Sequence, residues 1–185
     1  MTGLCLATAV LCLQGFELME EGKDCITNKD MGFFLMKPWK SEQWEMRTKG
    51  VRLENALAAV VFKAKDVSIE VAAEAAKPGV DLKKAADALV KELKESESHK
   101  ECKVKWSARK EFASKKTKEK AYSLDLQLTD AEQKKVVWRV WIFQSSKNDN
   151  LFKVAITGSE EDLKELAKDI DSIIGEFETK PVKKK

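Results

Sequence analysis

Four glutamates in the first half of the chain carry the side chains whose chemistry is easiest to name. Glu42 and Glu45 lie in a short tryptophan-containing stretch. Glu70 lies within a run of alternating apolar residues, and Glu74 follows directly after it. Carboxylates beside a cleft can act as general acids and bases in hydrolysis. Glu70 and Glu74 would, however, lie on the solvent-facing side of a strand, where charge is ordinary. A hydrolase-type enzyme with a carboxylate-based cleft is therefore the alternative hypothesis.

The remaining reactive side chains form no catalytic or metal-binding motif. The only histidine, His99, lies in a polar stretch and has no Ser, Cys or carboxylate at a spacing that would require it. The sequence contains no Gly-rich phosphate loop, no His-Glu-x-x-His motif and no Cys-x-x-Cys pair. We therefore expect no enzyme activity, no cofactor and no bound metal.

Tryptophans and one arginine are the candidates for binding a ligand or a partner. Trp39 and Trp44 bracket a polar tetrapeptide, Trp106 lies in an alternating run, and Arg139 interrupts an otherwise apolar segment. Indoles at such positions are more often part of the core with one edge exposed. Alternatively, these side chains line a binding pocket at the end of the sheet. We predict Trp39, Trp44, Trp106 and Arg139 as the contacts to an unknown protein or small ligand.

The elements that must position these residues are clearest in the second half of the chain. Residues 122–128 alternate apolar and polar side chains, which predicts a half-buried strand. Residues 136–143 are apolar on both faces except at Arg139, as in a central strand that is covered on both sides. Residues 151–157 predict a third strand. Because the connections are short, the three strands are expected to form an antiparallel meander.

Two amphipathic helices are expected to pack on this sheet. Ser159 can cap a helix whose apolar stripe runs from Leu163 to Phe177. Asp81 can cap a second helix with an alanine-rich stripe, which suits a close approach to the sheet. Further strands are predicted over residues 31–37, 44–47, 57–62, 67–73 and 104–112, and polar loops over residues 17–30, 95–103 and 114–120.

Residues 4–13 form an uncharged apolar segment that is similar to the hydrophobic region of an export signal. The segment is too short to span a bilayer as a helix, so no stable membrane span is expected. No Lys or Arg precedes it, and its alternative is a buried helix or strand in a cytoplasmic protein. Export to a periplasmic or extracellular location is favoured. Cys25 and Cys102 would remain after cleavage, either as a disulfide or, as we favour, as free thiols.

The charge balance bears on the choice of partner. The chain has 185 residues with 34 basic and 31 acidic side chains, which give a net charge of +3. This near-cancellation argues against nucleic acid as a partner. We expect a monomer with an N-terminal apolar segment and linker (residues 1–27), a single domain (residues 28–178) and a basic tail (residues 179–185).

The order of these elements resembles the PsbP superfamily. The resemblance rests on the opening at residues 28–38, the apolar strand at residues 56–66, the strand at residues 152–157 and the helix end at residues 173–177. It implies an α+β fold in which helices flank both faces of an antiparallel sheet, an α/β/α sandwich. Members of this superfamily mostly act as binding or accessory proteins. The resemblance therefore implies a non-enzymatic binding module and carries over no catalytic residue.

Overall fold

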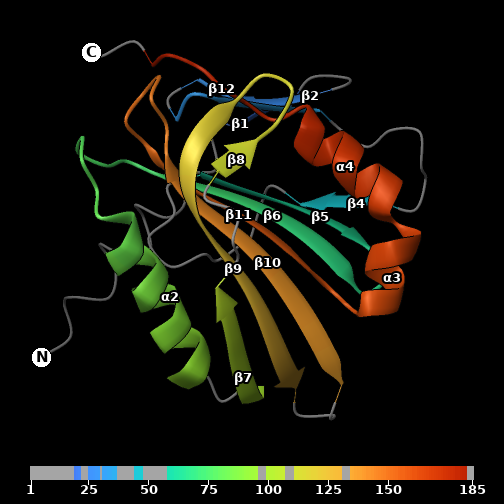
Figure 1. Ribbon diagram of the computed structural model, residues 1–185. Helices are drawn as coiled ribbons and strands as arrows, with labels where there is room; N and C mark the ends of the chain where they lie inside the picture. The colour runs from blue at the N-terminus through green and yellow to red at the C-terminus, as the bar shows by residue number, and fades with distance from the viewer. Residues whose placement is uncertain are drawn as a thin grey trace, which may run out of the picture.

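The computed structural model of the chain describes residues 19–21, 25–29, 31–36, 44–47, 58–95, 99–106, 111–130 and 134–182. These residues form two antiparallel sheets and three helices (Figure 1). The larger sheet contains β4 (Glu45–Arg47), β5 (Ala58–Ala64), β6 (Val67–Glu74), β7 (His99–Trp106), β8 (Glu111–Ala113), β9 (Lys118–Asp130), β10 (Lys135–Gln144) and β11 (Leu151–Gly158). The smaller sheet contains β1 (Met19–Glu21), β2 (Cys25–Asn28), β3 (Phe33–Met36) and β12 (Glu178–Thr179). The helices are α2 (Leu82–Glu95), α3 (Glu160–Glu165) and α4 (Ala167–Gly175).

The larger sheet is built around the predicted meander. Its strand order is β4-β5-β6-β11-β10-β9-β7, and β8 pairs with the first residues of β9. Strands β9, β10 and β11 are consecutive antiparallel neighbours, so the predicted meander is confirmed. In this meander the inner strand β10 is hydrogen-bonded to a neighbour along both of its edges. The sheet curls strongly, as Figure 1 shows.

Strand β10 separates two cores because its successive side chains point to opposite faces. Val140 and Ile142 belong to one apolar cluster, which also contains Leu89 and Leu93 of α2. Phe143 belongs to the other cluster, together with Ile170 of α4. Residues 136–143 are therefore apolar on both faces because each face packs in a separate core, as predicted for a strand covered on both sides.

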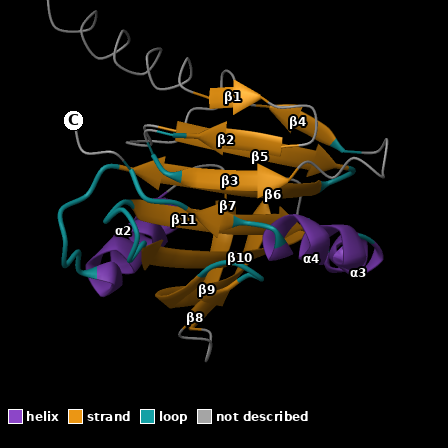
Figure 2. Ribbon diagram, turned by 90° about the horizontal axis from the view of Figure 1, so that it is seen from above, coloured by secondary structure: helices purple, strands orange, loops and turns teal. Residues whose placement is uncertain are grey.

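The smaller sheet closes the second cluster. Ile26, Phe33 and Leu35 are at most 1% exposed and pack in the same cluster as Phe143. Phe33 lies with its ring centroid 6.1 Å from that of Phe152 in β11. Figure 2 shows the small sheet as a layer above the meander strands. Long-range aromatic contacts thus join the two sheets.

Both predicted helix caps are confirmed. The Asp162 amide donates to the Ser159 hydroxyl at 3.1 Å, and the Lys84 amide donates to the Asp81 carboxylate at 3.1 Å. The single C-terminal helix that we predicted is instead two short helices, because Leu166 leaves the helical region with φ −90° and ψ 8°. Leu166 is itself 3% exposed. The bend therefore keeps the apolar side of both α3 and α4 against the core.

The predicted fold class is confirmed for the antiparallel sheet and not for the layering. Helix α2 packs mainly against β7, β9 and β10, so it covers one part of the curled sheet. Helices α3 and α4 contact β11 and β3, and the small sheet completes the layer beside them. Within the described residues, the architecture is a strand-rich, curled sheet with local helical cover (Figure 2).

Several predicted loops are strands. The stretch 17–30 contains β1 and β2, the stretch 95–103 overlaps β7, and the stretch 114–120 includes the start of β9. The predicted strand 104–112 is divided, because β7 ends at Trp106 and β8 begins at Glu111. Of these strands, β1 and β7 lie at sheet edges, where many charged residues are tolerated and apolar periodicity is weak. Residues 4–13 lie outside the described ranges, and the export signal stays a prediction.

Candidate functional site

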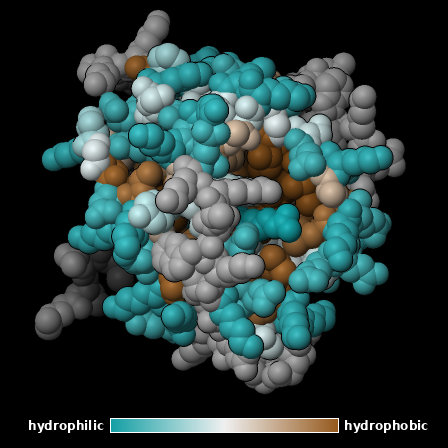
Figure 3. Space-filling view, in the orientation of Figure 1, coloured by the Kyte–Doolittle hydropathy of each residue, from teal (hydrophilic) through white to brown (hydrophobic). Residues whose placement is uncertain are grey.

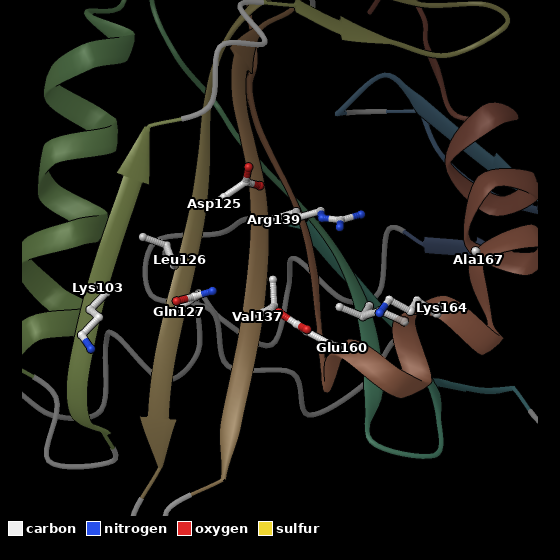
Figure 4. A pocket seen from close by; sticks show the side chains of 10 residues that line it. Lys103, Asp125, Leu126, Gln127, Val137, Arg139, Glu160, Lys164 and Ala167 are labelled. Carbon is white, nitrogen blue, oxygen red and sulfur yellow. The ribbon is translucent and has the colours of Figure 1, made fainter.

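A pocket of about 710 Å³ opens between the meander and α3. Figure 4 shows its two walls, with strands β7, β9 and β10 on one side and α3 on the other. Figure 3 shows a hollow on this face of the molecule, where hydrophobic surface appears between hydrophilic ridges. The pocket is lined by Lys103, Asp125, Leu126, Gln127, Val137, Arg139, Glu160, Leu163, Lys164 and Ala167.

The strand register determines which side chains form the sheet wall. Val137 pairs with Gln127, and Arg139 pairs with Asp125. Gln127 also pairs with Lys103 of β7, so the three strands contribute one continuous row. Directly paired residues on neighbouring antiparallel strands point to the same face. The polar residues of the pocket therefore share one face of the sheet.

This polar row continues an aromatic face. Two and four residues beyond Arg139 on β10 lie Trp141 and Phe143, which belong to or pack against the cluster under the small sheet. Phe112 contacts both rings, with centroid distances of 6.1 Å and 4.6 Å. The same face is thus packed at one end of the strands and open at the other, and the pocket lies at the open end.

Helix α3 forms the opposite wall. Its cap at Ser159 fixes the start of the helix directly after β11, and Glu160, Leu163 and Lys164 then line the pocket. Leu163 is buried, whereas Glu160 and Lys164 are exposed. Spacings of three and four residues place these side chains on one side of the helix. Helix α3 therefore contributes two exposed charged side chains and one buried apolar side chain to the pocket.

Four of the five charged side chains in the described lining of the pocket do not neutralise one another. The described residues provide no hydrogen bond or ion pair to the side chains of Arg139, Asp125, Glu160 or Lys164. In Figure 4 the Arg139 guanidinium extends from β10 toward the helices and away from β9, which carries Asp125. Arg139 therefore presents its donors to the open space between the sheet and α3.

The structure places the four predicted contact residues differently. Arg139 lines the pocket. Trp44 is half-buried against the core, and its indole Nε1 donates to Asp169 of α4 at 3.0 Å, so it does not line the pocket. The backbone of Trp106 pairs with Leu124 at the end of β7, but its side chain is not among those described. Trp39 lies outside the described residues.

Sequence reasoning missed most of the pocket. The sequence pattern places Asp125 and Gln127 on the polar face of a strand. It places Glu160 at the start of a helix and Lys164 on the solvent-facing side of that helix. The signal that could have found Asp125 is the meander itself, because antiparallel register places it opposite Arg139. Lys103 was assigned to a loop and so could not be placed beside Gln127.

The carboxylates of the hydrolase hypothesis do not meet at this pocket. Glu70 and Glu74 lie on β6, four residues apart, which separates them by roughly 13 Å along the strand. Glu45 lies on β4, and Glu42 is outside the described residues. None of the described members of this set lines the pocket. The hydrolase alternative therefore has no assembled carboxylate pair among the described residues.

Glu74 nevertheless has an altered pKa. Burial raises the pKa of its carboxyl group above the ordinary value of 4.5, and the nearby Lys153 partly opposes this rise. The folded state therefore binds this proton more tightly than the unfolded state does. Its stabilising effect is complete below the unfolded pKa and is lost as the pH rises through the folded pKa.

We expect Glu74→Gln to raise the free energy of unfolding at about pH 7, where the native carboxylate is charged and partly desolvated. At about pH 3 both side chains are neutral, so the two proteins should be equally stable. Urea unfolding at the two pH values measures the difference. The gain should be small because Glu74 remains largely solvated. Equal stabilities at neutral pH would contradict the assigned direction of the shift.

Three further properties of the described residues bear on what the protein could bind. They contain no group of three or more His, Cys, Asp or Glu side chains that could hold a metal ion. Cys25 is a free thiol. None of the helices in the described ranges has the length and apolar character needed to cross a membrane.

Comparisons with known proteins establish the fold. No family model and no curated protein matches the sequence. The solution structure of cyanobacterial PsbP (CyanoP) from Synechocystis sp. PCC 6803 is similar, with 9% identity, a TM-score of 0.51, and coverage of 88% of this chain and 99% of that one. The chain therefore has the PsbP-like fold that its element order predicted.

Two other solved structures are similar at lower TM-scores. LpqN of Mycobacterium tuberculosis, which is involved in cell envelope biogenesis, has 12% identity and a TM-score of 0.47, with 76% of this chain and 80% of that chain covered. The Ran-binding protein Mog1p of Saccharomyces cerevisiae has 12% identity and a TM-score of 0.41, with 81% and 91% covered.

Proposed function

We propose that this protein is a non-enzymatic binding or accessory module, and that it binds a protein or small-ligand partner at the pocket between the meander and α3. The observation that carries the proposal is Arg139, a guanidinium without a partner among the described residues at the mouth of a ligand-sized pocket. We further propose that the module is exported, because residues 4–13 are similar to the hydrophobic region of an export signal. We propose that it acts as a single-domain monomer.

The position of Arg139 suits binding rather than chemistry. It lies within β10, which is paired along its length with both β9 and β11. A side chain on such a strand starts from a rigid backbone, and less conformational freedom is lost when it binds. The described residues that line the pocket include no histidine or cysteine, and the acids among them are Asp125 and Glu160. Arginine forks recognise carboxylates and phosphates without any bond being made or broken.

We expect Arg139→Glu to abolish recovery of the native partner in an affinity pull-down from the host, because the substitution reverses the charge at the pocket mouth. Lys147→Glu is the matched control. Lys147 is an exposed lysine in the turn after β10, and it does not line the pocket. Partner recovery should survive the control substitution.

A thermal melt of each variant shows whether it is folded. Recovery of the same partner by folded Arg139→Glu would contradict the proposed binding face. Loss of the partner with both variants would also contradict it, because binding would then respond to charge anywhere on the surface. Trp39, Trp44 and Trp106 remain predicted contacts, and alanine substitutions at the three positions extend the same pull-down.

A further inference from the structure

We infer that the pocket receives a small organic monoanion, whose carboxylate-like group binds between Arg139 and Lys164 and whose apolar body lies on Val137, Leu163 and Ala167. The inference rests on the proposed function, because it specifies the class of ligand for the same pocket. It combines the unpaired cations, the apolar strip beneath them and the two acids that limit the charge of the ligand.

The two cations belong to opposite walls. Arg139 comes from β10 and Lys164 from α3, and Figure 4 shows Arg139 extending across the gap toward the helix that carries Lys164. Neither side chain has a hydrogen bond or ion pair with another described residue. A guanidinium can donate two parallel hydrogen bonds to one carboxylate, and an ammonium adds a point charge. An anion placed between them would meet donors from both sides.

The floor of the pocket is apolar. Leu163 is 7% exposed, Val137 is half-buried, and Ala167 follows on the first turn of α4. The volume of about 710 Å³ lies within the range of small-molecule pockets, roughly 300 to 1,000 Å³. A bare inorganic anion would leave this apolar surface in contact with water. A ligand with a hydrocarbon portion would cover it and gain affinity from burial.

The two acids restrict the charge of the ligand. Asp125 lies opposite Arg139 on β9, and Glu160 lies one turn before Lys164 on α3. Both line the pocket, so a ligand with two negative charges would be repelled by them. A cation would be repelled by Arg139 and Lys164 in turn. Among the described lining residues, Asp125 and Glu160 therefore make one negative charge on the ligand more favourable than two.

Four probes with the same eight-carbon chain test the inference on the full-length protein. Octanoate, octyl phosphate, octanol and octylamine are titrated separately, and binding is followed by isothermal calorimetry and by backbone amide chemical shifts. Octanoate should bind more tightly than the other three, and its largest shifts should lie in β10 and α3. Its affinity should fall with added salt, because charge attraction is screened.

Three variants separate the cations that line the pocket from one that does not. Arg139→Gln and Lys164→Gln should each weaken octanoate binding about tenfold, since each removes a charge-assisted contact. Lys168→Gln, one turn further along and outside the lining, should leave the affinity unchanged. Melting curves confirm that the variants are folded. Octanol binding should be the same in all four proteins.

The possible outcomes distinguish this inference from the proposed function. If octanol or octylamine binds as tightly as octanoate, or if Arg139→Gln has no effect on octanoate, the monoanion inference is overturned while the pocket remains a binding site. Octyl phosphate binding more tightly than octanoate overturns the single-charge requirement. If octanoate fails to bind but the host partner is still lost with Arg139→Glu, the inference is wrong and the proposed function stands.

Discussion

Gly32→Ala is expected to lower the free energy of unfolding by about 3 kcal/mol or more. Gly32 has φ +66°, a conformation that costs a residue with a side chain about 1 to 2 kcal/mol. A Cβ at this position would also lie 2.4 Å from the Nδ2 atom of Asn148 and 2.4 Å from the carbonyl oxygen of Lys180. The backbone oxygen cannot move without shifting the strand end beside it.

The groups that crowd Gly32 also hold the two sheets together. The Asn148 amide donates to the carbonyl oxygens of Met31, Gly32 and Lys180 at 3.3, 3.0 and 2.8 Å. The Asn150 amide donates to Met31 at 2.9 Å. The β10–β11 turn is thus fastened to the start of β3 and to the residue after β12. Displacing Asn148 would remove its three hydrogen bonds, which adds to the cost, while the Met31 and Gly32 carbonyls keep the Asn150 side chain and the Lys180 amide as donors.

Gly79→Ala is the matched control. Gly79 also has a positive φ, +83°, but a Cβ there would meet nothing within 4 Å. Its substitution should cost only the backbone strain, about 1 kcal/mol. Urea unfolding of the two variants therefore separates crowding from strain. Equal losses of stability would show that the close approach at Gly32 does not hold in solution.

The parts of the fold that the sequence predicted are those encoded locally. The meander is specified by alternation over residues 122–128 and 151–157 and by a doubly apolar run between them. The two helix starts are specified by Ser159 and Asp81, whose side chains accept from amides three residues away. Period and capping act within a few residues, so they can be read without knowing the neighbours in space.

The parts that were missed depend on partners distant in sequence. Strand β2 has only four residues, and it becomes a strand by pairing with β1 and β3 under a core that includes the far end of the chain. Strand β7 is predominantly polar and is stabilised by pairing with β9. The pocket was missed for the same reason, since Asp125, Lys103 and Lys164 meet only after the register and the position of α3 are known.

Phe177→Ala is expected to cost about 3 to 5 kcal/mol, the range for removing a buried aromatic side chain. Phe177 is 0% exposed and follows α4, just before β12. Its ring contacts four others, with the centroids of Phe112, Phe152, Phe143 and Phe33 at 5.4, 5.7, 6.1 and 6.5 Å. Three of the contacts are edge-on, a geometry that adds to the energy of burial.

This ring joins strands that are otherwise in different sheets, because Phe33 belongs to β3 and the other three belong to β8, β10 and β11. Phe34→Ala is the control on the same small sheet. Phe34 is half-buried, and its ring lies under the ammonium groups of Lys116 and Lys180, so its removal should cost about 1 kcal/mol.

Chemical denaturation of the two phenylalanine variants compares these costs directly. A loss for Phe177→Ala no greater than for Phe34→Ala would mean that the small sheet is not packed on the meander. Because Phe177 is not among the residues that line the pocket, folded Phe177→Ala should keep the ligand affinity of the native protein. The aromatic cluster around Phe177 would then determine stability, and the pocket at Arg139 would determine binding.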